Sequence, residues 1–130
     1  MPDFSVTCAP ILELPRSAEI IIEGGVNASN ATTLKDKISG SLDKKTTYVS
    51  ILMRNVAYVN SSGFGYFMDL AGMLERRGGA LVLVEVQPKV KVVFDLMGLG
   101  AALPLHRSVA AAVRSAASAA ARRSLSRDRA

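Results

Sequence analysis

Two adjacent serines at the end of an apolar run are the residues of this chain best placed to do chemistry. The run 48–53 has the composition of a buried strand, and Asn60-Ser61-Ser62-Gly63 follows it and opens a segment with helical periodicity. The first N–H groups of a helix have no partner within the helix and lie at the positive end of its dipole. A phosphate on either serine would therefore sit where an anion is favoured.

The two hydroxyls can divide the work between them. Either serine could simply cap the helix by accepting a hydrogen bond from a backbone N–H group. With two serines, one can cap while its neighbour accepts a phosphate, which adds about −1.5 to −2 charges. The helix end would tolerate this charge, whereas a partner docked on the same spot would be repelled. The pattern thus allows a switch in which modification changes binding without unfolding the domain.

The sequence shows no catalytic or metal-binding arrangement around these serines. His106, the one histidine, is far along the chain from the serines and from Cys8. The sequence therefore identifies no general base that could activate a serine or cysteine nucleophile. The CxxC and HxxxH spacings of metal sites are absent, and the acidic residues are scattered. We therefore expect a protein that is modified or recognised rather than an enzyme, with no catalytic residues, no metal and no cofactor.

The glycine motifs near the serines are incomplete. Gly63 and Gly65 have the spacing of the first two glycines of a dinucleotide fingerprint, but Met68 occupies the place of the third. The Gly-Lys-Ser/Thr ending of a P-loop is absent. The loop after the 48–53 run contains Asn55 and Asn60, where a phosphorelay receiver would need an aspartate.

Short apolar runs alternate with helix-periodic segments, which predicts an α/β sandwich with helices packed on a mostly parallel sheet. We expect about four to five strands and about four helices in one domain over residues 1–121. The strands are predicted within 4–14 and at 19–23, 48–53 and 81–84, and the helices at about 30–42, 63–77, 88–97 and 108–121. Residues 122–130 form a basic tail whose composition favours disorder.

The helix that follows the serines should have two distinct faces. At about 100° per residue, one arc is apolar and should face the sheet, and it holds Phe64, Phe67, Met68, Leu70, Ala71 and Leu74. The opposite side holds Tyr66, Asp69, Met73 and Arg76. Tyr66 and Met73, seven residues apart, could form part of a docking surface, or could be a covered or an idle exposed pair. The next helix should bury the face formed by Val90, Val93, Phe94 and Met97.

The net charge of +5 comes mainly from the last 17 residues, so the rest of the chain carries about +1. The positive charges of those 17 residues are arginines, and no aromatic residues are interleaved with them. This argues against direct nucleic-acid binding. No apolar run approaches the ~20 residues that span a bilayer, so no stable membrane insertion is expected. A lone cysteine suits a reducing compartment, and the N-terminus lacks the order of a signal peptide. Cytoplasmic location is the simplest prediction.

The stretch 19–113 resembles a STAS domain of the anti-sigma factor antagonist type. The likeness rests on the apolar strand, the run Asn60-Ser61-Ser62-Gly63-Phe64-Gly65 and the apolar helix, and it continues through Arg77 to Val84, Pro88 to Phe94 and Met97-Gly98-Leu99. Gly24-Gly25-Val26-Asn27 is similar to the family's turn after its second strand. The combination is much more specific than any one of these pieces.

The resemblance implies a small bacterial regulator that switches partners. Such a protein binds an anti-sigma factor, often one with serine kinase activity, and so frees the sigma factor until phosphorylation ends the binding. The family's first serine accepts the phosphate, which implies Ser61 as the acceptor, Ser62 as the neighbouring helix cap, and Asn60 and Gly63 as the other members of the motif. Partner contacts are expected at Asn27, Tyr66, Asp69 and Met73. A serine phosphatase is a further candidate partner, and the chain is expected to be a monomer or a weak dimer.

Two asparagines depart from the family pattern. Asn60 replaces an aspartate, and Asn27 takes an acidic place in the earlier turn. Asparagine keeps the acceptor of an aspartate but removes a negative charge beside the phosphate site. Asn60 and the basic tail leave open a STAS scaffold or transport-accessory module that never meets a kinase. A nucleotide-binding module that uses the same helix start is a third interpretation.

Overall fold

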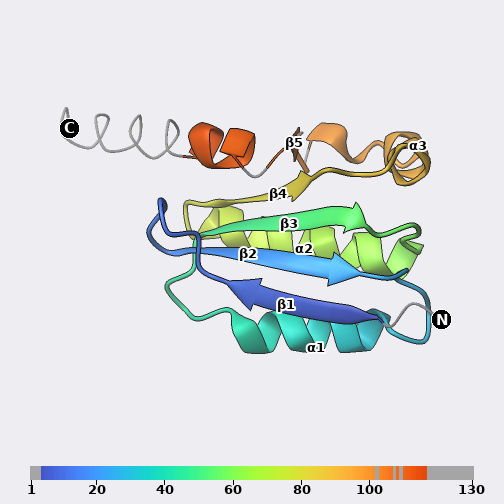
Figure 1. The fold of residues 1–130 in the computed structure, drawn as a ribbon, viewed down its shortest axis with the longest axis horizontal. Helices are drawn as coiled ribbons and strands as arrows, with labels where there is room; N and C mark the ends of the chain where they lie inside the picture. The colour runs from blue at the N-terminus through green and yellow to red at the C-terminus, as the bar shows by residue number, and fades with distance from the viewer. Residues whose placement is uncertain (1–3, 102, 107, 109, 117–130) are drawn as a thin grey trace.

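The computed structural model describes residues 4–101, 103–106, 108 and 110–116 (Figure 1). A five-stranded sheet with the order β1-β2-β3-β4-β5 forms its centre. β1 pairs with β2 in antiparallel orientation, and the remaining neighbours are parallel. The strands are β1 Ser5–Ala9, β2 Ser17–Glu23, β3 Tyr48–Asn55, β4 Ala80–Val84 and β5 Leu105–His106. The mostly parallel α/β sheet predicted from the sequence is therefore confirmed.

The helices alternate with the strands as expected. They are α1 Ala31–Ser41, α2 Ser61–Arg76, α3 Pro88–Leu96 and the short 3-10 helix η1 Leu99–Ala101, and residues 110–116 are also helical. Pro88 occupies the first turn of α3, where its missing N–H costs little. Gly98 ends this region with φ of +68°, a conformation that suits glycine. No helix in the described part of the chain is long and apolar enough to cross a membrane.

The main core lies between one face of the sheet and the helices α1 and α2. Successive side chains of β3 point to opposite faces, so Val49, Ile51 and Met53 enter this core. α1 contributes Leu34 and Ile38, which are fully buried. α2 contributes the predicted arc, in which Phe64, Phe67, Leu70, Ala71 and Leu74 are buried and Met68 is half-buried. Apolar periodicity thus gives the correct inner face of this helix.

A second, smaller core covers part of the opposite face of the sheet. Tyr48 and Val82 point into it, together with Ala112 and Ala116 of the C-terminal helical segment. The Tyr48 hydroxyl donates a hydrogen bond of 2.9 Å to the backbone carbonyl of Ala112. Ala112 and Ala116, from the helix predicted at about 108–121, therefore pack on the sheet. Val109 and the tail at 122–130 lie outside the described residues.

The predicted inner face of α3 is only half correct. Val90 and Phe94 are buried, but Val93 is 42% exposed and Met97 is 44% exposed. The spacing of the apolar residues predicts one stripe along α3, but only Val90 and Phe94 of that stripe contact the core. No part of the described chain buries the rest of that stripe. The two-residue strand β5 was not predicted, because a run this short carries no periodicity.

Candidate functional site

Asn60, not Ser62, caps the helix that follows β3. The side-chain oxygen of Asn60 accepts a 2.8 Å hydrogen bond from the backbone N–H of Gly63, and the Asn60 backbone is extended, with φ of −79° and ψ of 171°. This is the geometry of an N-cap, whose side chain reaches the amide three residues on. The predicted capping role of Ser62 is thus corrected, because Ser62 is already the second residue of α2.

Both serines are exposed in the first turn of α2. The first backbone hydrogen bond of the helix is made by Phe64, whose N–H donates to the Asn60 carbonyl at 3.1 Å. The amides of Ser61 and Ser62 precede it, so they are among the donors for which a helix supplies no acceptor. No acidic residue lies in this first turn. A negative group on either hydroxyl would be attracted by the positive end of the helix, and no carboxylate in that turn would repel it.

The start of α2 is held against the turn that follows β2. The N–H of Val26 donates to the Tyr58 carbonyl at 2.8 Å, and the N–H of Asn60 donates to the Val26 carbonyl at 2.9 Å. Val26 and Val59 form an isolated parallel bridge in this way. The structure therefore brings the two motifs of the sequence together, although 33 positions separate Asn27 from Asn60.

Gly63 is required by this close approach. A Cβ atom at Gly63 would lie 2.8 Å from Cγ1 of Val26 and 2.9 Å from Cγ1 of Val59. Such distances are too short for carbon atoms, so a side chain here would force the helix away from the turn. The glycine of the motif thus serves the packing between the two loops.

The side chain of Asn27 stabilises its own turn. Its oxygen accepts hydrogen bonds from the backbone N–H and the hydroxyl of Ser29, at 2.9 and 2.6 Å, and from the N–H of Asn30 at 3.2 Å. The Asn30 amide in turn donates to the Gly25 carbonyl at 2.8 Å. An asparagine here performs the Asx-turn role for which an aspartate would also serve. Contact between Asn27 and a partner stays a prediction.

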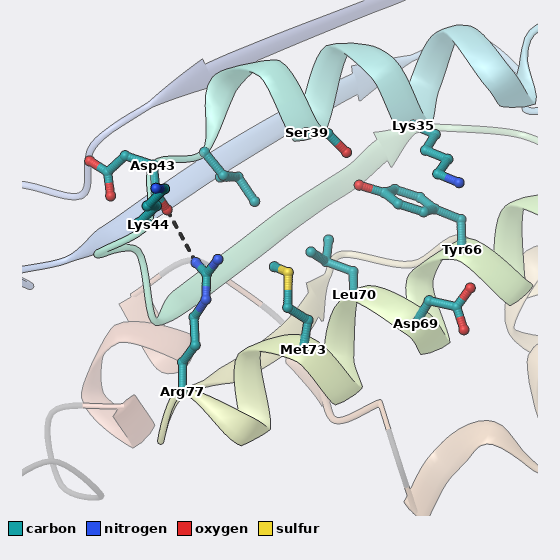
Figure 2. A pocket seen from close by; sticks show the side chains of 10 residues that line it. Lys35, Ser39, Asp43, Lys44, Tyr66, Asp69, Leu70, Met73 and Arg77 are labelled. Atoms are coloured by element: carbon teal, nitrogen blue, oxygen red, sulfur yellow. Dashed lines mark hydrogen bonds between the residues drawn. The ribbon is translucent and has the colours of Figure 1, made fainter.

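The side chains of Tyr66 and Met73 line a groove between α1 and α2 (Figure 2). They are half-buried and pack against the main core, whereas Asp69 is exposed. Burial raises the pKa of the Tyr66 hydroxyl, which points toward Ser39 of α1. Of the alternatives left open by the sequence, Tyr66 and Met73 therefore form a partly covered pair, because α1 lies alongside α2 and a helical projection does not show this neighbour.

The groove extends toward the serines. Its 280 Å³ section, lined in part by Leu42 and Arg77, meets a 410 Å³ hollow lined in part by Ser62. Lys35, Tyr66 and Asp69 line both sections. Arg77 closes the far end by donating hydrogen bonds to the carbonyls of Asp43 and Thr46, at 3.1 and 2.9 Å. Sequence reasoning missed Lys35 and Arg77, since neither has a neighbour in sequence that signals a groove.

The structure keeps Cys8 and His106 apart. Cys8 lies on β1 and His106 on β5, which are the two opposite edges of the sheet. Burial raises the pKa of the Cys8 thiol, which disfavours the nucleophilic thiolate. Within the described ranges, no group of three His, Cys, Asp or Glu side chains is placed to hold a metal ion.

A family model and two curated relatives match this chain. The family model described as the STAS domain matches residues 13–112. BtrV of Bordetella bronchiseptica, assigned as an anti-sigma factor antagonist, is 31% identical over 91 residues, covering 70% of this chain and 78% of BtrV. The anti-sigma-B factor antagonist of Bacillus subtilis is 27% identical over 81 residues, covering 62% of this chain and 73% of that protein.

Solved structures share the fold. A protein of Thermotoga maritima assigned as an anti-sigma factor antagonist matches with a TM-score of 0.78 at 16% identity, covering 85% of this chain and 93% of that one. SpoIIAA in its unphosphorylated form matches with a TM-score of 0.66 at 20% identity, covering 87% and 96%. The phosphorylated form of Bacillus SpoIIAA gives 0.60 at 20% identity, covering 87% and 99%. The family match over residues 13–112, together with the identity to BtrV, shows that the chain belongs to the STAS domain family.

Proposed function

We propose that this protein is an anti-sigma factor antagonist whose binding to an anti-sigma factor with serine kinase activity is switched by phosphorylation of Ser61. The observation that carries the proposal is the exposed Ser61 at the first position of α2, next to a cap that Asn60 already provides. The names of BtrV and of the Bacillus subtilis relative support the class of partner. The SpoIIAA structures, in unphosphorylated and phosphorylated forms, support the kind of switch.

The geometry lets a phosphate act on binding alone. Within the described residues, no hydrogen bond of the Ser61 hydroxyl supports the fold, and the helix is capped by the neighbouring Asn60 side chain. A phosphate would place about −1.5 to −2 charges at the positive end of α2 and so would not melt the helix. A partner whose surface covers Ser61 would meet a desolvated negative charge and dissociate. This separation of folding from binding is what a reversible switch requires.

Asn60 is compatible with phosphorylation of Ser61. Its oxygen performs the cap as an aspartate would, and its amide is neutral. A carboxylate in the same place would repel a phosphate on the adjacent residue. The scaffold alternative relied on Asn60 as a departure from the family, and the cap geometry weakens that reason.

The site assignment is tested by incubating the purified chain with the anti-sigma factor kinase of the same organism and ATP. We expect wild type and Ser62→Ala to accept one phosphate and Ser61→Ala to accept none. Ser62→Ala is the matched control, because Ser62 is also exposed and does not cap the helix. The assignment to Ser61 would be wrong if Ser61→Ala were phosphorylated as readily as wild type.

A further inference from the structure

The exposed large apolar side chains of this protein gather on and beside α3. Of the six in the described residues, four belong to α3 or its cap, namely Val92, Val93, Leu96 and Met97. Leu96 is 82% exposed. Tyr58, which is 56% exposed, is the fifth and lies on the loop between β3 and α2. The sixth, Leu12, lies far along the chain on the connection between β1 and β2.

The loop and the helix share one surface. A hollow of 160 Å³ opens between them, and Tyr58 lines it on one side and Lys89 and Val93 on the other. We call Tyr58, Val92, Val93, Leu96 and Met97 together the α3 patch. Val92 and Val93 lie one helical turn before Leu96 and Met97, so these four side chains are neighbours on the helix surface. Exposed apolar patches often mark interaction sites.

The α3 patch begins close to the proposed switch site. Tyr58 precedes Ser61 by three residues, so their Cα atoms lie within about 11 Å of one another along any chain path. A specific protein interface covers about 800 Å² on each partner. A partner that covers Ser61 over such an area is large enough to reach Tyr58 and, through Tyr58, the edge of α3.

The charges around the patch define the surface that would fit it. Lys91 pairs with Asp95 at 2.7 Å, and Arg54 pairs with Glu85 at 2.7 Å. Neither of these ion pairs, the two formed among the described residues, involves the exposed Lys89 on the rim of the hollow. An apolar surface bordered by a carboxylate that meets Lys89 is complementary to this arrangement.

We propose that the α3 patch is the apolar anchor by which the unphosphorylated protein holds its anti-sigma factor, with a carboxylate of that partner on Lys89. The inference rests on the proposed function, and it moves the main contact from the α1–α2 groove to α3. The groove is the weaker candidate, because Tyr66 and Met73 are already half-covered by the protein itself and Arg77 is held by backbone carbonyls. Phosphorylation of Ser61 would then release the partner from the margin of this anchor.

Photo-crosslinking in the native host tests the location and the occupant together. A photoreactive phenylalanine derivative replaces Leu96 in one variant, Gly65 in a second and Leu12 in a third. Gly65 reports on the Ser61 region, and it is exposed with nothing within 4 Å of its Cβ position. We expect positions 96 and 65 to crosslink to the anti-sigma factor and position 12 to give no such product.

The other outcomes separate the two proposals. Crosslinking of the anti-sigma factor at 65 but not at 96 overturns the α3 anchor and leaves the proposed function in place. A product at 96 that contains a second copy of this chain overturns the anchor in favour of self-association. Failure at both 96 and 65 contradicts the proposed function as well.

A titration with the purified anti-sigma factor measures the contribution of the patch. We expect Leu96→Glu to weaken binding of the unphosphorylated chain by about 10-fold or more, as for a well-buried interface residue. Leu12→Glu, which changes a leucine that is 92% exposed, should change the dissociation constant by less than about 2-fold. Both variants should unfold at the same urea concentration as wild type. Equal affinity of Leu96→Glu and wild type overturns the anchor.

Discussion

The side-chain oxygen of Asn60 lies 2.8 Å from the backbone nitrogen of Gly63, and this hydrogen bond gives the structural role in the motif to Asn60 rather than to the serine proposed as the phosphate acceptor. Asn60 holds the helix start, and the two serines between these residues are left with exposed hydroxyls. Removal of the cap should therefore cost stability, whereas removal of either hydroxyl should not.

Asn60→Ala should lower the free energy of unfolding by about 1 kcal/mol, because the N–H of Gly63 loses its acceptor. Asn60→Asp keeps the acceptor and should stay within about 0.5 kcal/mol of wild type. Urea denaturation followed by circular dichroism measures both. Ser62→Ala is the internal comparison, and a loss at Ser62 as large as that at Asn60 would show that the cap has been assigned to the wrong residue.

Gly63→Ala should destabilise the protein by about 1–3 kcal/mol, since the new methyl group would overlap Val26 and Val59. Gly65→Ala is the matched control in the same helix. Its Cβ has nothing within 4 Å, and alanine is the better helix former, so this variant should be more stable by up to about 1 kcal/mol. Thermal unfolding of the pair measures the difference, and equal midpoints would contradict the close approach of the two loops.

Ser50→Ala should raise the free energy of unfolding by about 1 kcal/mol. The Ser50 hydroxyl is fully buried in β3 and has no hydrogen-bond partner among the described residues. No hydrogen bond therefore offsets the free-energy cost of removing this hydroxyl from water. Thr46 is the contrasting buried hydroxyl, because it donates to a carboxylate oxygen of Asp43 at 3.2 Å. Thr46→Ala should therefore lower stability by about 1 kcal/mol. Denaturant titrations in which both variants shift in the same direction would contradict this account.

The Tyr48 hydroxyl should make stability depend on pH in the alkaline range. Burial raises the pKa of Tyr48 from about 10 to about 12. The pKa of Tyr48 in the folded protein lies above its value in the unfolded chain. The neutral phenol therefore contributes fully to the free energy of unfolding below pH ~10, and this contribution is lost as the pH rises toward 12. The loss amounts to about 2 kcal/mol. Tyr48→Phe should be less stable at pH 7, by about 1 kcal/mol for the bond to Ala112, and should lack this part of the alkaline loss. Parallel stability profiles for the two proteins would contradict the burial of the phenol.

The sequence predicts the sheet and the inner face of α2 well because both depend on local periodicity. β3 reads as a continuous apolar run since it is buried on both faces, and β4 does so for the same reason. β5 escapes prediction because two residues owe their pairing to β4 rather than to any pattern of their own. The sequence thus predicts helices and strands that are long enough to show an apolar periodicity of their own.

The site is predicted in composition but not in detail. Asn60, Ser61 and Ser62 are all good cap residues, and a shift of one position in the helix start decides between them. Which residue caps depends on the Val26–Val59 bridge, a contact between distant segments. In the same way, the sequence predicts the apolar stripe of Val90, Val93, Phe94 and Met97 on α3. It does not predict whether another element covers Val93, because that depends on tertiary packing. Arrangements that arise between segments need the structure.

The proposed switch is tested most directly by the affinity of this protein for the proposed anti-sigma factor partner before and after phosphorylation. Calorimetry with the unmodified chain and with the chain phosphorylated on Ser61, its modification verified by mass spectrometry, gives both dissociation constants. We predict that the phosphorylated form binds at least about 10-fold more weakly while its unfolding midpoint stays unchanged. Equal affinity of the two forms would contradict the account.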